Sequence, residues 1–261
     1  PGEVLPLDRL IDQLWADEPP SSATGTLQAY ISQLRRALEP DRAPRTPPKT
    51  LLTREPGYLL DIDPAQVDLV RFTRDVDAGR RALHAGDPAG ADAHFRASVT
   101  HWRGSALQDF SDLAFAQPTI TRMHDLHLVS HELQIEAWLA LGRHTEAVLK
   151  LEQIVERHRF RERFWALLAL GLYRSGRQAD ALGAIQRVRT LLADELGLDP
   201  GPELRELEAA VLRQDRSLDL PPVPGGQAVI TAPHLYLAPA APPTDPVPQP
   251  FPGTPPLGAT G

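Results

Sequence analysis

The chain has 261 residues, enough for one large domain or two ordinary ones, and 42% of them are hydrophobic, enough for packed cores. It contains no cysteine, which excludes disulfides and thiolate metal sites. The net charge of −7 argues against a uniformly basic nucleic-acid binder, and no apolar run approaches the roughly 18 residues of a membrane span.

The N-terminus shows no targeting signal. The chain opens with Pro1-Gly2-Glu3 and lacks a basic, apolar leader. A secretory signal peptide needs a charged start followed by an apolar stretch. We therefore expect a cytoplasmic protein with no membrane partner.

Two short amphipathic helices are predicted next, over residues 7–15 and about 23–38. The intervening Pro19-Pro20 stops the first helix, and Ser21-Ser22 can cap the second. Helical spacing predicts one buried stripe on the second helix, formed by Leu27, Ile31, Leu34 and Leu38. The opposite side is small, polar or basic and comprises Thr26, Ala29, Ser32, Gln33 and Arg36.

A β-hairpin is predicted after these helices, because Gly57 separates the apolar segments 51–53 and 58–60. Residues 20–54 carry six basic and two acidic side chains, so one basic segment lies in an acidic protein. The order of these elements is that of a winged helix-turn-helix: a helix, a turn broken by proline, an amphipathic helix, a basic loop and a hairpin. The sequence thus predicts this fold for residues 1–63.

Residues 64–218 are predicted to be helical throughout and to repeat. Residues 141–147 (LGRHTEA) match residues 175–181 (SGRQADA) at an offset of 34, and Ala85-Gly86-Asp87 followed by Ala91 gives a weaker third copy. Thirty-four residues is the period of tetratricopeptide helix pairs. Glycine can end one helix in a left-handed conformation, and the small alanine lets the next helix approach closely.

Residues 219–261 hold 13 of the 27 prolines and have only Asp219 and Asp245 as charged residues. Such a composition buries too little apolar surface to fold. We expect a disordered tail, or a linker to a further domain.

Several motifs resemble one known family. The segments DRLIDQLW (residues 8–15), TLQAYISQLRRAL (26–38) and REPGYLL (54–60) closely resemble the Streptomyces antibiotic regulatory protein family, whose DNA-binding half is of the OmpR/PhoB type. VDLVRF (67–72) and DELGLDPGPELREL (194–207) resemble the start and end of its bacterial transcriptional activation domain.

This resemblance implies a mostly α-helical protein: a truncated winged helix-turn-helix (residues 1–63), a tetratricopeptide-like activation domain (64–218) and the proline-rich tail (219–261). Family members carry a β-platform and a first helix before the equivalent of Pro1, so we expect an N-terminally incomplete DNA-binding domain. The implied partners are double-stranded DNA at promoter direct repeats, RNA polymerase and a second copy on DNA. The implied role is control of a secondary-metabolite gene cluster.

The resemblance also implies the DNA-binding residues. Gln28, Ala29 and Gln33 are the expected base readers, since glutamine suits adenine edges and alanine a thymine methyl. Arg54 is expected at the wing, in the minor groove or on the backbone. The expected phosphate contacts, which position the helix without specifying sequence, are Thr26, Tyr30, Ser32, Arg35 and Arg36. Alternatively, these arginines only solvate a surface helix.

Other functions find less support in the sequence. One side of a helix that is apolar on both sides carries His124, His127 and His131, which indicates packed or hydrogen-bonded histidines rather than metal ligands. No phosphate loop, nucleophile elbow or zinc-protease motif is present, so we expect no catalytic residue, no enzyme activity and no cofactor. The remaining alternative is a tetratricopeptide-like scaffold that does not bind DNA.

Overall fold

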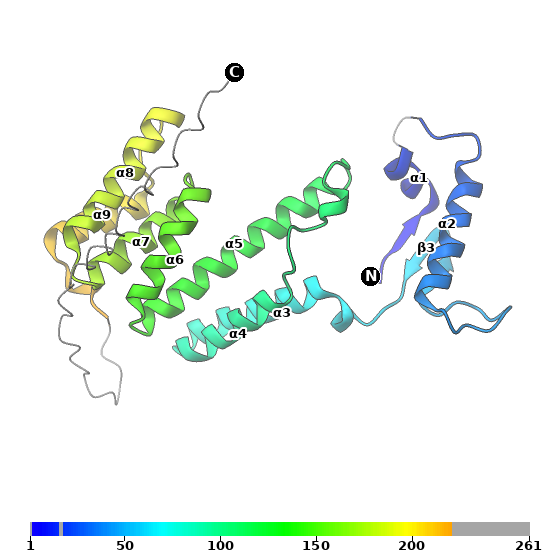
Figure 1. Cartoon of the computed structure of the whole chain (residues 1–261), viewed down its shortest axis with the longest axis horizontal. Helices are drawn as coiled ribbons and strands as arrows, with labels where there is room; N and C mark the ends of the chain where they lie inside the picture. The colour runs from blue at the N-terminus through cyan, green and yellow to red at the C-terminus, as the bar shows by residue number, and fades with distance from the viewer. Residues whose placement is uncertain (1, 16–17, 221–261) are drawn as a thin grey trace, which may run out of the picture. The chain divides into compact units, whose positions relative to one another are not determined.

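The computed structural model describes residues 2–15 and 18–220. The predicted tail, residues 219–261, lies outside the described residues except for Asp219 and Leu220. A small sheet with two helices is followed by a mainly helical region, as predicted (Figure 1). The prediction of helix throughout is wrong for residues 101–116, which form turns and one short 3₁₀ helix. Within the described ranges, no helix is long and apolar enough to cross a membrane.

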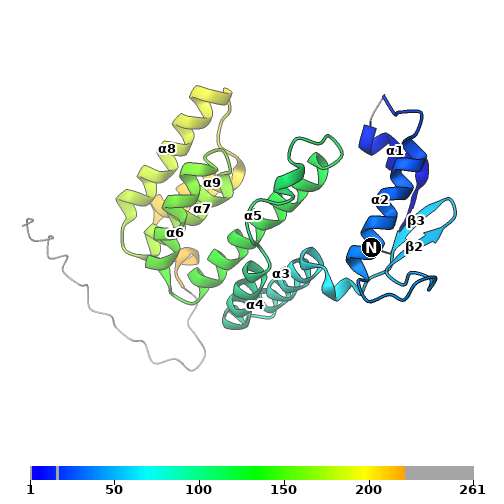
Figure 2. The same ribbon diagram turned by 45° about the vertical axis from the view of Figure 1, so that its right-hand side comes forward.

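The N-terminal sheet contains the antiparallel strands β1 (Val4–Pro6), β2 (Leu51–Arg54) and β3 (Gly57–Leu60). The central strand β3 pairs with β1 on one side and with β2 on the other. Figure 2 shows β2 and β3 as a hairpin beside α2. The hairpin confirms the prediction, whereas β1 was not predicted, because three residues that end in proline give no alternating pattern.

Helices α1 (Leu7–Trp15) and α2 (Ala23–Leu38) have the predicted bounds. Leu27 and Ile31 of α2 pack with Leu51 of β2 and with half-buried side chains of α1. Burying each such side chain stabilises the fold by about 1.5–3 kcal/mol. Ser22 occupies the N-cap position of α2, but its side chain accepts no capping hydrogen bond.

The predicted buried stripe of α2 is wrong over its second half. Leu34 and Leu38 are 50% and 46% exposed, although helical spacing places them on the side of Leu27 and Ile31. The physical reason is that, within the described residues, the apolar cluster around Leu27 contains no residue of α2 after Ile31. The second half of the helix therefore has no apolar cluster of the described elements packed over it. Leu14 of α1 is likewise 48% exposed.

Gly57 is not the turn residue that the sequence suggests. Glu55 and Pro56 form the turn, and Gly57 is the first residue of β3. A Cβ atom at Gly57 would lie 1.9 Å from the backbone oxygen of Leu5 in β1. Glycine is therefore needed here because the backbones of β1 and β3 approach closely.

The helical region begins after a short 3₁₀ helix (Pro64–Gln66). Its helices are α3 (Asp68–His84), α4 (Pro88–Thr100), α5 (Gln117–Ala140), α6 (His144–Arg157), α7 (Glu162–Arg174), α8 (Gln178–Leu196) and α9 (Pro202–Arg213). Two more 3₁₀ helices cover Gln108–Phe110 and Arg216–Leu218. Successive helices pack in pairs, α3 on α4, α6 on α7 and α7 on α8.

The predicted repeat is confirmed by the backbone. The glycines of the three copies, Gly86, Gly142 and Gly176, have φ angles of 75°, 76° and 76°. Helices α4, α6 and α8 begin two residues after them. The matching alanines are fully buried, which allows the close helix approach: Ala91, Ala147 and Ala181.

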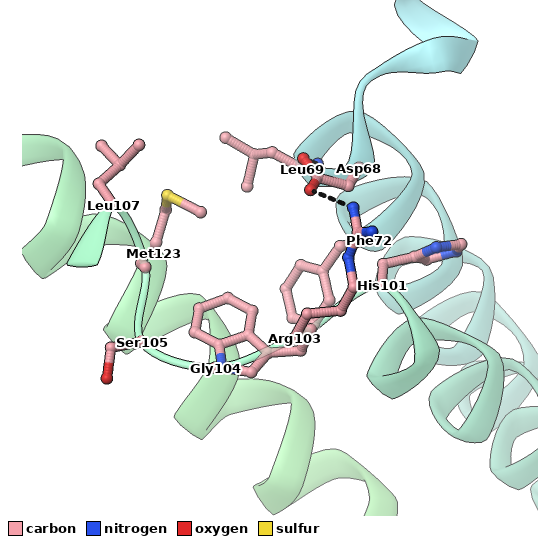
Figure 3. Close-up of a pocket in the computed structure, with 11 residues that line it drawn as sticks. Asp68, Leu69, Phe72, His101, Arg103, Gly104, Ser105, Leu107 and Met123 are labelled. Carbon is pink, nitrogen blue, oxygen red and sulfur yellow. Dashed lines mark hydrogen bonds and ion pairs between the residues drawn. The ribbon is translucent and has the colours of Figure 1, made fainter. Parts of the chain in front are cut away.

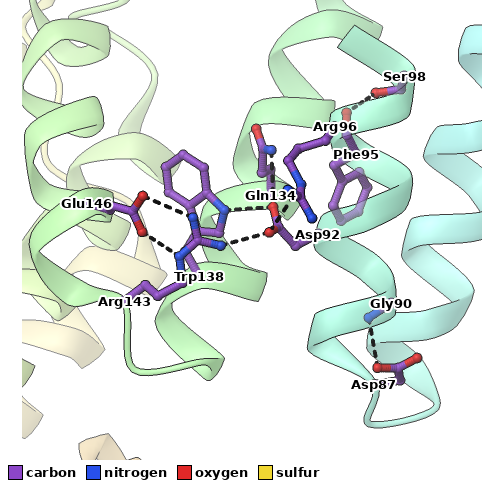
Figure 4. Close-up of polar contacts among 10 residues, drawn as sticks. All are labelled: Asp87, Gly90, Asp92, Phe95, Arg96, Ser98, Gln134, Trp138, Arg143 and Glu146. Carbon is purple, nitrogen blue, oxygen red and sulfur yellow. Dashed lines mark hydrogen bonds and ion pairs between the residues drawn. The ribbon is translucent and has the colours of Figure 1, made fainter. Parts of the chain in front are cut away.

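A buried carboxylate joins the first helix pair to the rest of the helical region (Figure 4). Asp92 of α4 accepts hydrogen bonds from Trp138 Nε1 at 2.8 Å, from the guanidinium of Arg143 at 2.7 Å and from Gln134 Nε2 at 3.3 Å. Burial alone would raise the pKa of Asp92, but these hydrogen bonds outweigh it and lower the pKa below the usual value. The charged carboxylate thereby holds α4 against α5.

Of the three histidines of α5, His127 and His131 are half-buried and packed, as predicted, whereas His124 is exposed. The ring of His127 stacks on Trp102 with a centroid separation of 4.1 Å, and His131 lies 4.5 Å from His127. Burial, with the neighbouring His127, lowers the pKa of His131 to about 4. Within residues 2–15 and 18–220, no His, Asp or Glu cluster is arranged to hold a metal ion.

Candidate nucleic-acid interface

The outward side of α2 is open to solvent. Ala29, Gln33 and Arg36 recur at helical spacing and are all exposed, opposite the buried Leu27 and Ile31. With 16 residues, α2 is roughly 24 Å long. The major groove of B-DNA, about 12 Å wide, admits a helix of this kind. The side that would face the groove is thus small, polar and basic.

Arg35 ties α2 to the hairpin. Its Nε donates to the backbone oxygen of Leu51 at 2.8 Å, and its Nη2 donates to the Thr53 hydroxyl at 2.8 Å. The guanidinium also lies 5.8 Å from the ring centre of Tyr58. This half-buried side chain uses its donors within the domain, so it sets the position of the hairpin relative to α2.

The loop between α2 and β2 is organised by Glu39. Its carboxylate accepts hydrogen bonds from the backbone N–H groups of Thr50 at 2.6 Å and Lys49 at 2.7 Å. The bond from Thr50 is the largest cause that lowers the pKa of Glu39. Arg42 lies 3.4 Å from the same carboxylate and donates to the backbone oxygen of Thr46 at 2.5 Å. Glu39 and Arg42 therefore compensate each other's charge.

Four basic side chains of the segment stay exposed: Arg36, Arg45, Lys49 and Arg54. None of them forms an ion pair with another described residue. Arg54 ends β2 next to the hairpin turn. The positive charge offered to solvent therefore comes from the C-terminal part of α2, the loop and the hairpin.

The structure brings the predicted DNA-binding residues onto two adjoining elements, α2 and the β2–β3 hairpin. Seven of them are exposed: Gln28, Ala29, Tyr30, Ser32, Gln33, Arg36 and Arg54. Two are half-buried, Thr26 and Arg35. The exposed Arg45 and Lys49 were not predicted, because a count of charges cannot tell which cations are engaged inside the fold.

A three-stranded sheet, a helix with an open polar side and a repeat-built helical region define a winged helix-turn-helix regulator with an attached helical domain. Residues 1–60 match the family model described as "Transcriptional regulatory protein, C terminal", and residues 67–212 match "Bacterial transcriptional activator domain". The chain belongs to the family of bacterial transcriptional regulators that combine these domains, the Streptomyces antibiotic regulatory proteins.

Curated relatives share both domains. The regulatory protein DnrI of Streptomyces peucetius is 37% identical over 236 residues, which cover 88% of this chain and 87% of DnrI. The transcriptional regulatory protein EmbR of Mycobacterium tuberculosis is 40% identical over 208 residues, which cover 80% of this chain and 53% of EmbR. The chain therefore spans about half the length of EmbR.

A solved structure has the same fold. Mycobacterium tuberculosis EmbR, in complex with a low-affinity phosphopeptide, gives a TM-score of 0.77 at 39% sequence identity. The match covers 81% of this chain and 55% of the EmbR chain. This likeness supports the winged-helix and helical-repeat description of the chain.

Proposed function

We propose that the chain binds double-stranded DNA sequence-specifically and activates transcription. The observation that carries this proposal is the exposed side of α2, with Ala29, Gln33 and Arg36, beside a hairpin that bears the exposed Arg54. A helix in the major groove reads base edges, while a wing reaches the adjacent backbone or minor groove. Membership of a family of transcriptional regulators supports the same function.

Within this interface, Ala29 and Gln33 are the proposed base readers, and Gln28 reads from the edge of the same side. A glutamine can form two hydrogen bonds with adenine, and the alanine methyl can contact a thymine methyl. Ala29 and Gln33 are both exposed, and neither belongs to the apolar cluster that contains Leu27 and Ile31. Each can therefore reach a base edge without displacing the core.

The proposed phosphate contacts come from the flanks of α2 and from the wing. They are Thr26, Tyr30, Ser32, Arg36 and Arg54, to which the structure adds Arg45 and Lys49 as exposed cations. We assign Arg35 a positioning role instead, because its donors bind Leu51 and Thr53. Phosphate contacts set affinity and orientation and make binding depend on salt.

We further propose residues 1–63 as the DNA-binding domain, 64–218 as the activation domain and 219–261 as a tail or linker. The family-model matches, which break between residues 60 and 67, support the first boundary. The family resemblance supports RNA polymerase as a partner, two copies on direct repeats, a cytoplasmic location and control of a secondary-metabolite cluster. We propose no catalytic role and no cofactor.

The test is selection of bound duplexes from a random DNA pool, followed by fluorescence anisotropy with the selected site. We expect Gln33→Ala to weaken binding to that site by about 1–3 kcal/mol and to change binding to unrelated DNA little. Arg36→Ala should weaken binding to both DNAs and lower the slope of log K against log salt by about 0.9.

The matched control is Arg205→Ala, since Arg205 is an exposed arginine of α9 in the other half of the chain. This variant should bind DNA as the unchanged protein does. If no sequence is enriched, or if all three variants behave alike, the DNA-binding proposal fails. The tetratricopeptide-like repeat would then favour a scaffold, recognised by protein partners without DNA affinity.

A further inference from the structure

A groove of about 520 Å³ lies between α3, over residues 69–81, and the start of α5. Its floor is apolar and includes Leu69, Val70, Met123 and Leu126, of which Val70 is 38% exposed. Figure 3 shows an adjoining cavity that shares Leu69 and Met123 with this groove and places them on opposite sides, one on α3 and one on α5. A concave apolar floor can receive the apolar side of an amphipathic helix.

The rim of the α3–α5 groove is basic. It carries three exposed arginines and one half-buried aspartate: Arg74, Arg81, Arg122 and Asp77. Arg74 and Asp77 already pair with neighbouring residues of α3. Arg81 and Arg122 form no ion pair with any residue in the described ranges. The groove therefore offers unpaired positive charge on a chain whose net charge is −7.

We infer that the α3–α5 groove binds an acidic amphipathic helix of a partner protein. The groove follows α3 from Leu69 to Arg81, about 18 Å at 1.5 Å per residue, which matches roughly three turns of a bound helix. Apolar side chains at i, i+3, i+4 and i+7 fill such a floor. Acidic side chains on the flanks of that helix pair with Arg81 and Arg122.

The charge of the rim decides the kind of occupant. A basic helix would meet two unpaired arginines and lose affinity through repulsion, whereas an acidic helix gains both steering and pairing. The inference goes beyond DNA binding, since it involves no residue of α2 or the hairpin.

The test uses the full chain and two fluorescein-labelled, helix-stabilised peptides of about 14 residues. Both carry leucine at i, i+3, i+4 and i+7, with glutamate on the flanks of one and lysine on the flanks of the other. Anisotropy titration should show the glutamate peptide binding at least about tenfold more tightly than the lysine peptide. The preference should shrink as salt is added.

A double charge reversal, Arg81→Glu with Arg122→Glu, should weaken the glutamate peptide about tenfold and strengthen the lysine peptide. A misfolded variant could not gain affinity, so this reversal separates a local effect from unfolding. Arg205→Glu on α9 is the matched control and should leave both affinities unchanged.

Three results would overturn the inference. They are no binding of either peptide, equal binding of both peptides, and a double reversal that weakens both peptides alike. Sedimentation of the same proteins tests whether a second copy of the chain occupies the groove instead. If neither peptide binds, and if the chain self-associates in a way that the double reversal abolishes, the groove is assigned to a second copy.

Discussion

Replacing His131 with glutamine should remove much of the acid sensitivity of the helical domain. Burial, followed by the neighbouring His127, lowers the pKa of His131 from 6.5 to about 4. Between these values the unfolded chain binds a proton that the folded chain does not, so stability falls as the pH decreases. The contribution of His131 is fully present above pH 6.5 and is lost progressively below it.

The magnitude follows from the two pKa values. A difference between 6.5 and about 4 corresponds to about 3 kcal/mol once the pH lies below both values. About 2 kcal/mol of this should already be lost between pH 7.5 and pH 5. Carboxylates, with unfolded pKa values near 4, change their charge little over that range.

Urea unfolding followed by circular dichroism at 222 nm, at pH 7.5 and at pH 5, measures this loss. The unchanged protein should lose about 2 kcal/mol more than His131→Gln. His94→Gln, at an exposed position of α4, is the matched control and should behave like the unchanged protein. If His131→Gln loses as much stability as the control, burial of His131 does not govern the acid response.

Other substitutions test the packing of each domain by the same urea assay. Asp92→Ala leaves the buried donors of Trp138 and Arg143 unpaired and should lower the free energy of unfolding by about 2–3 kcal/mol. If the variant is as stable as the unchanged protein, these hydrogen bonds do not stabilise the fold. Gly57→Ala should lower the stability of the sheet, because its Cβ would lie 1.9 Å from the Leu5 backbone oxygen of β1, and anisotropy should show weaker DNA binding; unchanged values in both assays would refute the close approach. Gly176→Ala should cost about 1 kcal/mol at its positive φ, while no change would show that the turn relaxes.

Much of this protein could be predicted from local sequence patterns. Residues 7–15 and 23–38 form the predicted helices because apolar spacing and Pro19-Pro20 are signals carried by neighbouring residues. The 34-residue offset likewise placed two left-handed glycines, Gly142 and Gly176, at helix junctions, and the weaker third copy placed Gly86 at another. The polar side of α2 followed from the same periodicity.

Contacts between distant segments could not be predicted in this way. Strand β1 exists because Val4–Pro6 pairs with β3, more than fifty residues away in the sequence. Leu34 has the same helical spacing as Ile31 yet is exposed, because burial depends on what packs opposite. Periodicity assigns a side of a helix, and only the neighbouring element decides whether that side is covered.

The candidate site also combines features that the sequence determines with features that only the tertiary structure decides. The sequence by itself determined that α2 has a polar, basic side and that arginines cluster between residues 20 and 54. Only the tertiary structure decided which arginines face solvent: Arg35 donates to the hairpin and Arg42 pairs with Glu39, while Arg36 stays free of ion pairs among the described residues. The physical reason is that a side chain's charge is inherent in its residue type, whereas its hydrogen-bond partners depend on segments that folding brings together.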